Sequence, residues 1–414
     1  MTGGAMDRAP AHAPGRPGAA PADPAEVLSR LLGGRSGLGA APPHADPDPD
    51  PGPGPGPGPG PGPGPGGTSA RTGTRTATRG GGTRTEGTRT GSGIVVPPLY
   101  CPDAVRDDPA LADAVNEELV RWADDIGIYA GRLDMLRSCH FGRLMMLAHP
   151  DCDDADRLLA AARCGLSEWA VDDHWADDGE DADPRLIGLR TALAHAVVDP
   201  VRLPPRHERQ FEDRVAAEPV LRAFRSALDH LAEFASPTQV TRLRYQLAVM
   251  FVGYNHEAEW RTSARRPPVW EYLLHRYENG FFPCMDLTDA VGGYEVPAHE
   301  FADARVRRTY MYAGVATCLL NDLYSMARED PGDTNLPRLI AAEEHCSLQE
   351  AVNRTAAIHD EVMHTVEAES AALAALGSPA LGRFLEGIRN WMGGAKEWHA
   401  TSPRYHGPAG GGTP

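Results

Sequence analysis

The sequence lacks the features that mark secreted and membrane proteins. It contains no run of about 18 apolar residues, so nothing in it predicts a membrane-spanning helix. No continuous apolar stretch of signal-peptide type occurs near the N-terminus. The seven cysteines form no CxxC pair, which argues against a zinc site or a disulfide framework and favours a reducing compartment. We therefore expect a cytoplasmic protein without membrane insertion.

Positive charge is also scarce. The formal net charge is −17, and Lys396 is the only lysine. The first 94 residues contain nine Arg and seven acidic residues, so the excess of negative charge lies in the rest of the chain. An acidic body argues against nucleic acids and anionic membrane surfaces as partners, and acidic residues around a cleft would attract divalent cations.

Apolar residues are almost missing from the first part of the chain. Residues 46–67 alternate Pro with Asp or Gly, and a Thr/Arg/Gly-rich stretch follows. Such a segment cannot bury enough apolar surface to offset the entropy lost on ordering. We predict a disordered leader over residues 1–95, one folded domain over residues 96–406, and a disordered tail over residues 407–414.

The folded part has a helical pattern throughout. Apolar residues recur every three or four positions, and Gly or Pro residues separate the periodic segments. This predicts an all-α bundle of about ten helices. The clearest candidates are Ala110–Ile126, Ala155–Asp177, Phe211–Phe234, Thr238–Arg261, Val269–Asn279, Val306–Glu329, Leu348–Leu376 and Pro379–Ala400.

Three oxygen-bearing side chains follow one another at the end of the apolar segment that precedes them. Asn321, Ser325 and Glu329 are spaced four residues apart. Each four-residue step on an α-helix rotates a side chain by only about 40°, so the three would share one helix face. Amide, hydroxyl and carboxylate oxygens are hard ligands that suit magnesium.

A second acidic motif, DDHWADD, ends the predicted helix that begins at Ala155. It contains Asp172, Asp173, Asp177 and Asp178. Four carboxylates at the C-terminal end of a helix repel one another and oppose the helix dipole, unless a cation binds them. A solvated acidic turn is the alternative. Together with the Asn321, Ser325 and Glu329 ladder, however, the motif predicts a magnesium cluster, with Asp172, Asp173 and Asp177 as the ligands on this side.

Two magnesium-binding motifs imply a substrate that bridges them. Mg²⁺ keeps much of its water and binds through a few protein oxygens and substrate phosphates, so a diphosphate is the natural bridge. Arg276 could donate bidentate hydrogen bonds to it, and Arg404 with Tyr405 could supply a second group of donors. Taken singly, each arginine is equally compatible with a surface ion pair.

These motifs resemble those of the class I terpene synthases. DDHWADD is similar to the aspartate-rich motif of that family, and the segment NDLYSMARE from Asn321 to Glu329 fits its second metal motif. The resemblance covers about residues 97–406. It implies a class I terpenoid synthase α-helical bundle, a Mg²⁺ cluster and a prenyl diphosphate substrate. It also implies roles in binding the diphosphate for Arg276, Gly280, Arg328, Arg404 and Tyr405, and a catalytic role for Arg276, Arg404 and Tyr405.

A narrower resemblance is to an actinobacterial group of these synthases that converts 2-methylgeranyl diphosphate to 2-methylisoborneol. It rests on the Pro-rich leader and on the segments Tyr100–Pro102, Phe141–Pro150 and Glu168–His174. The chain departs from that group at Trp175-Ala176, where Tyr-Cys or similar residues are usual. The resemblance implies a magnesium-dependent lyase that ionises 2-methylgeranyl diphosphate, cyclises it and captures water. It also implies a functional link to a geranyl diphosphate methyltransferase.

Other interpretations remain open. The same fold would suit a sesquiterpene synthase that uses farnesyl diphosphate, a 2-methylenebornane synthase that ends by deprotonation or, less well, a prenyl-elongating synthase. A non-enzymatic alternative is a diphosphate-binding helical protein with a degenerate site. A homodimer is compatible with the sequence. Aromatic side chains should form the wall of the pocket, and the candidates are Phe141, Trp169, Trp175, Phe251, Tyr254, Trp260 and Tyr405.

Overall fold

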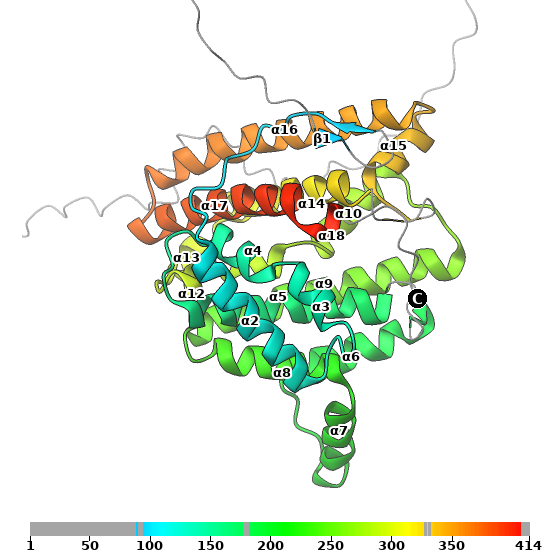
Figure 1. Cartoon of the computed structure of the whole chain (residues 1–414), viewed down its shortest axis with the longest axis vertical. Helices are drawn as coiled ribbons and strands as arrows, with labels where there is room; N and C mark the ends of the chain where they lie inside the picture. Colours follow the sequence, from blue (N-terminus) through cyan, green and yellow to red (C-terminus); the bar gives the residue numbers. More distant parts are fainter. Residues whose placement is uncertain (1–87, 90–93, 177–181, 327–328, 330–332, 407–414) are drawn as a thin grey trace, which may run out of the picture.

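The structure, a computed structural model, describes residues 88–89, 94–176, 182–326, 329 and 333–406. Helices dominate this part of the chain, which confirms the all-α fold class (Figure 1). One two-residue antiparallel pair joins β1 (Thr88–Arg89) to β2 (Val95–Val96). Three residues that we assigned to the leader, Thr88, Arg89 and Val95, are therefore part of a strand pair, while residues 1–87 lie outside the described residues.

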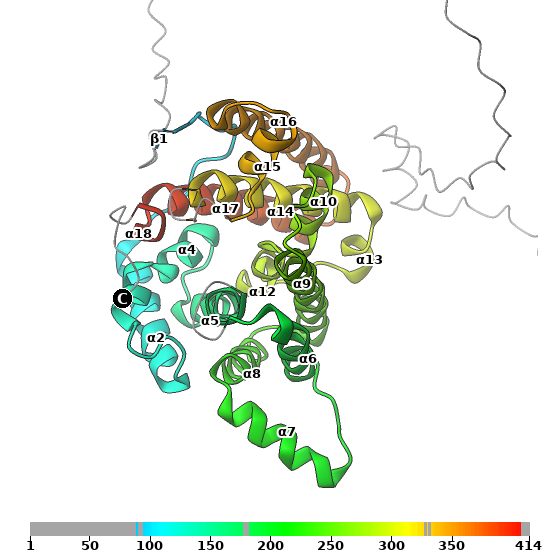
Figure 2. The same cartoon turned by 90° about the vertical axis from the view of Figure 1, so that its right-hand side faces the viewer.

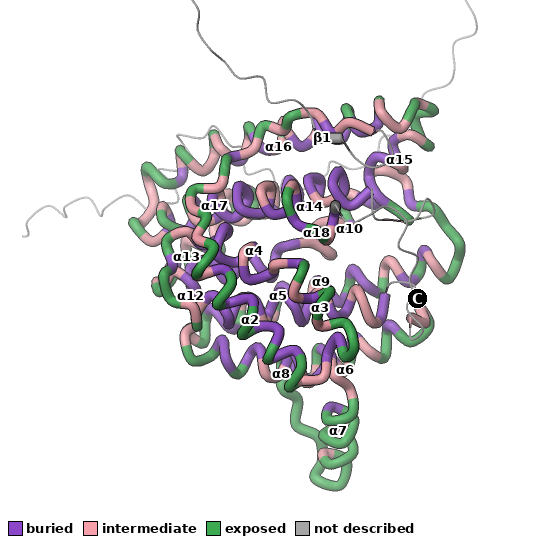
Figure 3. The backbone as a smooth tube through the Cα atoms, viewed as in Figure 1, coloured by how far each residue is buried: buried purple, intermediate pink, exposed green. Residues whose placement is uncertain are grey.

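The first half of the described chain forms a set of short and medium helices. They are α2 (Pro109–Ile126), α3 (Leu133–Ser138), α4 (Phe141–Ala148), α5 (Ala155–Val171), the π-helix η1 (Asp172–Ala176), the 3₁₀-helix η2 (Pro184–Leu186), α6 (Ile187–Val198), α7 (Pro205–Ala217) and α8 (Pro219–Leu231). α5 packs against α2, α4 and α8. α7 extends away from the other helices and is mostly exposed (Figures 2 and 3).

The second half contains the longer helices. They are α9 (Pro237–Ser263), α10 (Val269–Glu278), α11 (Phe282–Asp286), α12 (Thr288–Val291), α13 (Ala298–Phe301), α14 (Ala304–Ser325), α15 (Leu336–Glu343), α16 (Leu348–Ala374), α17 (Pro379–Thr401) and α18 (Pro403–His406). α14 packs against α10, α16 and α17, and α17 also packs against α4. α16 covers the outer side of α14 and α17, which are largely buried (Figures 1 and 3).

Local sequence signals explain where the main helices begin. Ser236 and Ser347 form capping boxes with Gln239 and Glu350. In each box the serine hydroxyl accepts from the backbone N–H three residues later, and the side chain at that later position accepts from the serine N–H. The side chain of Asp108 accepts a hydrogen bond from the Leu111 amide at the start of α2. Several of these helices have Pro at their first position, where its missing N–H costs nothing.

The structure differs from our predicted helices at two places in the first half. The segment Phe211–Phe234 is not one helix, because α7 ends at Ala217 and α8 begins at Pro219. Pro219 cannot donate the hydrogen bond of a helix interior and disfavours helical geometry at Glu218. The segment Ala155–Asp177 is regular α-helix only as far as Val171, after which the backbone changes to a π-helix.

Candidate active site

The aspartate-rich motif lies in η1, directly after α5. π-helical turns are rare and often mark functional sites. Asp172 and Asp173 occupy the first two positions of η1 and are partly buried, whereas Trp175 and Ala176 are buried. Asp177 and Asp178 lie outside the described residues. The π-helix thus places two of the four predicted carboxylates at the edge of the core.

Both oxygens of Asp173 have partners from distant parts of the chain. Arg404 Nη2 lies 3.3 Å from Oδ1, and the Tyr129 hydroxyl donates to Oδ2 at 2.7 Å. The Asp173 and Arg404 side chains are only 8% and 6% exposed. Tyr129 has φ 57°, a left-handed conformation that non-glycine residues adopt at a cost. A strained, buried tyrosine therefore fixes the orientation of this carboxylate.

The second predicted motif is at the C-terminal end of α14. Asn321 and Ser325 are on its last turn, and the helix ends at Ser325 instead of continuing to Glu329 as we predicted. The Glu329 N–H still donates to the Ser325 carbonyl at 3.1 Å, so one more helical hydrogen bond keeps the three residues in a row. The Ser325 hydroxyl also donates to the Glu329 carboxylate. Arg328 lies outside the described residues.

Arg276, on α10, reaches the same end of α14. Its Nη2 lies 2.9 Å from Asp322 Oδ1 and 3.2 Å from Asn321 Oδ1. Burial opposes the charged guanidinium, but the Asp322 carboxylate holds the pKa of Arg276 well above its usual value. The Tyr272 hydroxyl donates to the same Asp322 oxygen at 2.9 Å. Asp322 therefore positions Arg276 beside the predicted ligand Asn321.

Gly280 follows α10 and lies against α14. A Cβ atom at this position would be 2.4 Å from Cys318 Sγ and 3.0 Å from the Arg276 carbonyl oxygen. Only a residue without a side chain allows this approach. The glycine thus brings the end of the Arg276 helix close to the helix that carries Asn321 and Ser325.

The short helix α18 connects the two motifs. Arg404 is paired with Asp173 of η1, and the neighbouring Tyr405 accepts a hydrogen bond from Asn321 Nδ2 of α14 at 3.2 Å. The same Nδ2 lies 3.2 Å from His399 Nε2. The predicted residues Asp173, Asn321, Arg404 and Tyr405 are therefore joined in one network, although Asp173 and Arg404 are 231 positions apart in sequence.

Aromatic rings are packed next to this network. Trp169 lies 4.6 Å from Phe141 and 6.1 Å from both Phe281 and Trp398, measured between ring centroids. Trp398 is 5.4 Å from Tyr405, and the Arg404 guanidinium carbon lies 6.0 Å above the Phe141 ring. Of the aromatic residues predicted for the pocket wall, Phe141, Trp169 and Tyr405 belong to this cluster.

Two other predicted wall residues have their ring contacts elsewhere. The Phe251 ring packs against Phe224, and the Trp260 ring lies over His256 and His275. Tyr254 and Trp175 are buried, and the guanidinium of Arg190 lies 5.9 Å from the Trp175 ring. Helical aromatics are usual core residues, so their sequence positions alone could not separate the two groups.

Sequence reasoning missed several partners in the network. Asp322 is part of the second motif, but its sequence position does not show that it is buried beside Arg276, which lies on another helix. His399 lies six residues before Tyr405, on α17, the helix that precedes α18, which is a weak hint. Nothing in the sequence indicates that Tyr129 contacts Asp173.

The donor set fits a magnesium ion. Asp172, Asp173, Asn321, Ser325 and Glu329 offer only carboxylate, amide and hydroxyl oxygens, the donors that Mg²⁺ prefers. Zinc sites rely on nitrogen and sulfur ligands, which these residues lack. Burial raises the pKa of Glu329, and a bound cation would reverse this by favouring the carboxylate. The assignment of individual ligands remains a prediction.

An all-α bundle with two oxygen-rich motifs and two arginines around one position is the architecture of a class I terpene synthase. The chain belongs to the terpene synthase family: residues 166–365 match the model described as terpene synthase family 2, C-terminal metal binding. It is 37% identical over 320 residues to the 2-methylisoborneol synthase of Streptomyces ambofaciens, covering 75% of this chain and 72% of that one. It is also 37% identical over 316 residues to the 2-methylisoborneol synthase of Saccharopolyspora erythraea, covering 74% and 89%.

A solved structure supports the same relationship. The crystal structure of 2-methylisoborneol synthase from Streptomyces coelicolor A3(2), in complex with Mg²⁺ and 2-fluoroneryl diphosphate, matches with a TM-score of 0.72 and 34% identity. The match covers 75% of this chain and 97% of that chain. Our predictions of the family, of the terpene cyclase fold and of a lyase that acts on a diphosphate are confirmed. No described helix is long and apolar enough to cross a membrane.

Proposed function

We propose that the protein is a magnesium-dependent monoterpenoid cyclase that converts 2-methylgeranyl diphosphate and water to 2-methylisoborneol and diphosphate. The observation that carries the proposal is the link made by α18, because Arg404 and Tyr405 join the two oxygen-rich motifs around one position. A substrate diphosphate at that position would meet donors from α10, α14 and α18. The similarity to 2-methylisoborneol synthases supports the choice of substrate and product.

Asp172, Asn321, Ser325 and Glu329 would hold the magnesium ions. We assign Asp173 a different part, because the buried Arg404 already supplies its counter-charge and the Tyr129 hydroxyl donates to its other oxygen. It would keep α18 attached to the aspartate-rich motif. When bound, Mg²⁺ would neutralise negative charge on the diphosphate and so favour its departure as a leaving group.

The arginines and the tyrosine would complete the diphosphate site. Arg276 and Arg404 are buried and charged, so each would donate to diphosphate oxygens in a site of low dielectric constant, where such bonds are strong. The Tyr405 hydroxyl would donate a further hydrogen bond. The allylic C–O bond breaks, its electron pair leaves with the diphosphate, and the carbon chain becomes a cation.

The aromatic cluster next to Arg404 is suited to the cation that remains. Ring faces attract positive charge without offering a nucleophile, and close packing excludes bulk water. Phe141, Trp169 and Phe281 are the members that we expect to face the carbon chain. As in the group that the sequence resembles, isomerisation to a linalyl-type intermediate would precede closure to terpinyl-type and bornyl-type cations. Water would add to the last of these cations, and loss of one of its protons to the released diphosphate would give the neutral alcohol.

The decisive experiment is incubation of the purified protein with Mg²⁺ and one of three diphosphates: 2-methylgeranyl, geranyl or farnesyl diphosphate. We expect 2-methylisoborneol from the first, detected among the volatile products. Conversion of farnesyl diphosphate without conversion of 2-methylgeranyl diphosphate would refute the proposal in favour of a sesquiterpene synthase. Formation of 2-methylenebornane alone would refute water capture.

A variant pair tests the assignment of the metal site. Asn321→Ala should abolish turnover, because it removes a magnesium ligand and the partner of Tyr405. Asn353→Ala is the matched control, since Asn353 is an exposed residue of α16. Equal turnover in the two variants would show that the end of α14 is not the metal site.

Two partner predictions accompany the proposal. The substrate carries one methyl group more than geranyl diphosphate, so a methyltransferase that acts on geranyl diphosphate must supply it. A homodimer remains a prediction, which light scattering on the purified protein would check.

A further inference from the structure

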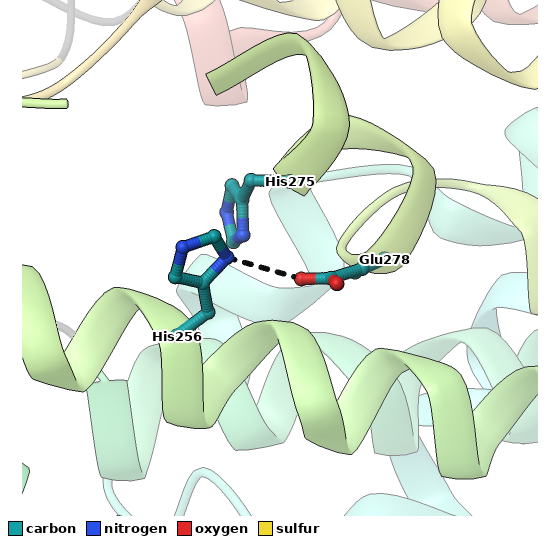
Figure 4. A group of neighbouring side chains, drawn as sticks. All are labelled: His256, His275 and Glu278. Atoms are coloured by element: carbon teal, nitrogen blue, oxygen red, sulfur yellow. Dashed lines mark hydrogen bonds and ion pairs between the residues drawn. The ribbon is translucent and has the colours of Figure 1, made fainter. Parts of the chain in front are cut away.

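A second group of ligand-type side chains lies between α9 and α10. It consists of His256 on α9 and of His275 and Glu278 on α10, which converge as Figure 4 shows. One ligand atom from each residue lies within 4.8 Å of the other two. None of the three belongs to the magnesium site assigned above.

His256 contacts two carboxylates, and a neutral imidazole can donate a hydrogen bond to only one of them. Its Nδ1 lies 3.2 Å from Glu278 Oε2, and its Nε2 lies 3.1 Å from Glu271 Oε1. A neutral ring carries one N–H, so it can donate to only one of two carboxylates. In the other contact a ring lone pair faces a carboxylate oxygen. A cation must lie between these two atoms, either a second proton on the ring or a metal ion.

Glu271 is a carboxylate that selects the tautomer of His256. It accepts hydrogen bonds from Arg265 Nη2 at 2.7 Å and from Trp260 Nε1 at 2.8 Å. Hydrogen bonds from Arg265 in particular lower the pKa of Glu271 to about 2. With Nε2–H directed at Glu271, the Nδ1 lone pair of His256 faces Glu278. A carboxylate that orients a histidine in this way is the usual second layer of a metal site.

His275 is the third member and is almost fully buried, at 3% exposed. Its Nδ1 has no hydrogen-bond partner, although buried ring nitrogens nearly always have one. A neutral imidazole carries one N–H and keeps the lone pair of its other ring nitrogen available. A buried ring with an unpartnered nitrogen, in a group with a histidine and a carboxylate, points to a ligand.

We infer that His256, His275 and Glu278 form a binding site for a borderline divalent cation such as Zn²⁺, separate from the magnesium site. Two imidazole nitrogens and one carboxylate oxygen are a donor set that zinc accepts, with water as the fourth ligand. Tetrahedral ligands at about 2.0–2.1 Å from a metal lie about 3.3 Å apart, close to the 3.2 Å between His256 and Glu278.

The site has an entrance and lies near the diphosphate-binding residues. The side chains of His256 and Glu278 are 24% and 22% exposed, so an ion can reach them from solvent. A metal ion would connect α9 to the last turns of α10, which carry Arg276. The inference does not depend on which prenyl diphosphate the enzyme uses.

Cobalt provides the probe. The full-length protein, freed of metal by a chelator and kept in excess Mg²⁺, is titrated with Co²⁺ while its visible absorption is recorded. We expect one equivalent to give the intense bands of tetrahedral cobalt with nitrogen ligands, and Zn²⁺ to displace it. The oxygen-rich magnesium site would give only weak octahedral bands.

Three variants and one control define the outcome. Glu278→Gln and His256→Gln should weaken binding of Zn²⁺ at least about tenfold, and Glu271→Gln by about 10–100-fold. His207→Gln is the control, because His207 is an exposed histidine on α7. These partly exposed positions spare the core, and circular dichroism verifies folding.

Two results would overturn the inference. One is the absence of tetrahedral cobalt bands in the wild-type protein. The other is an affinity for Zn²⁺ that is the same in Glu278→Gln, His256→Gln and His207→Gln. Either would show that the cluster is a network of hydrogen bonds and ion pairs that binds no metal.

Discussion

The contact between Arg276 and Asp322 allows the stability of the protein to be separated from its activity. The two side chains are 13% and 3% exposed, and their closest atoms are 2.9 Å apart. Asp322→Asn keeps an oxygen that accepts from the Tyr272 hydroxyl, but it leaves the buried guanidinium without a counter-charge. Breaking a buried pair in this way costs about 3–5 kcal/mol. For about 310 folded residues, that corresponds to a fall of ~6 °C in the melting temperature.

The double variant distinguishes charge pairing from general damage. Arg276→Met in the Asp322→Asn background removes both charges, so most of the lost stability should return. Turnover should not return, because the donor to the diphosphate has gone. Thermal unfolding and product formation are measured for the wild type, both single variants and the double variant.

Two outcomes would contradict a stabilising contact between Arg276 and Asp322. A double variant whose loss of stability equals the sum of the two single losses would show that the residues do not interact. An Asp322→Asn variant with wild-type stability and turnover would show that Asp322 does not position Arg276.

Three further perturbations test other parts of the structure. Burial raises the pKa of Glu168 from 4.5 to about 8, so the folded state holds a proton that the unfolded state has lost, and the free energy of unfolding should fall by on the order of 4 kcal/mol as pH rises between these values. Glu168→Gln should remove this fall, which urea titrations at pH 5 and pH 9 would measure. Gly280→Ala should lower the free energy of unfolding by about 1–3 kcal/mol, because the new Cβ would clash with Cys318 Sγ, and adding Cys318→Ala should recover part of that loss. An unchanged free energy in Gly280→Ala would contradict the close approach of Gly280 to α14. Asp172→Asn should raise the Mg²⁺ concentration needed for half-maximal turnover with little change in melting temperature. Asp173→Asn should instead lower the melting temperature, because it leaves Arg404 unpaired, and the reverse pattern would exchange the roles of the two aspartates.

Long amphipathic helices could be predicted from the sequence because their signals are local. The periodic patterns over Thr238–Arg261 and Pro379–Ala400 predicted α9 and α17 to within two residues at each end. Short helices such as α11 and α12 have too few residues for a period to show, and none was predicted. The break at Pro219 was missed because the apolar pattern continues across it.

The candidate site was predictable only in part, because its contacts are not local. The spacing of Asn321, Ser325 and Glu329 indicated a shared face, and one hydrogen bond beyond α14 preserves it. Roles for Arg404 and Tyr405 came from resemblance, since no local pattern brings Arg404 to Asp173. The contact of Tyr129 with Asp173 depends on a strained backbone that no residue type signals.

The π-helix at Asp172–Ala176 means that chain length, as well as residue identity, directs the carboxylates. A π-turn contains one residue more than the α-helical turn that would otherwise continue α5. Deleting a single residue there would allow a regular helix with better backbone hydrogen bonds. Closing the turn from i→i+5 to i→i+4 hydrogen bonds would also change the direction of the side chains within it relative to α5. Deleting His174 would therefore preserve both aspartates and improve the backbone hydrogen bonds, yet turn the carboxylate of Asp173 away from Arg404.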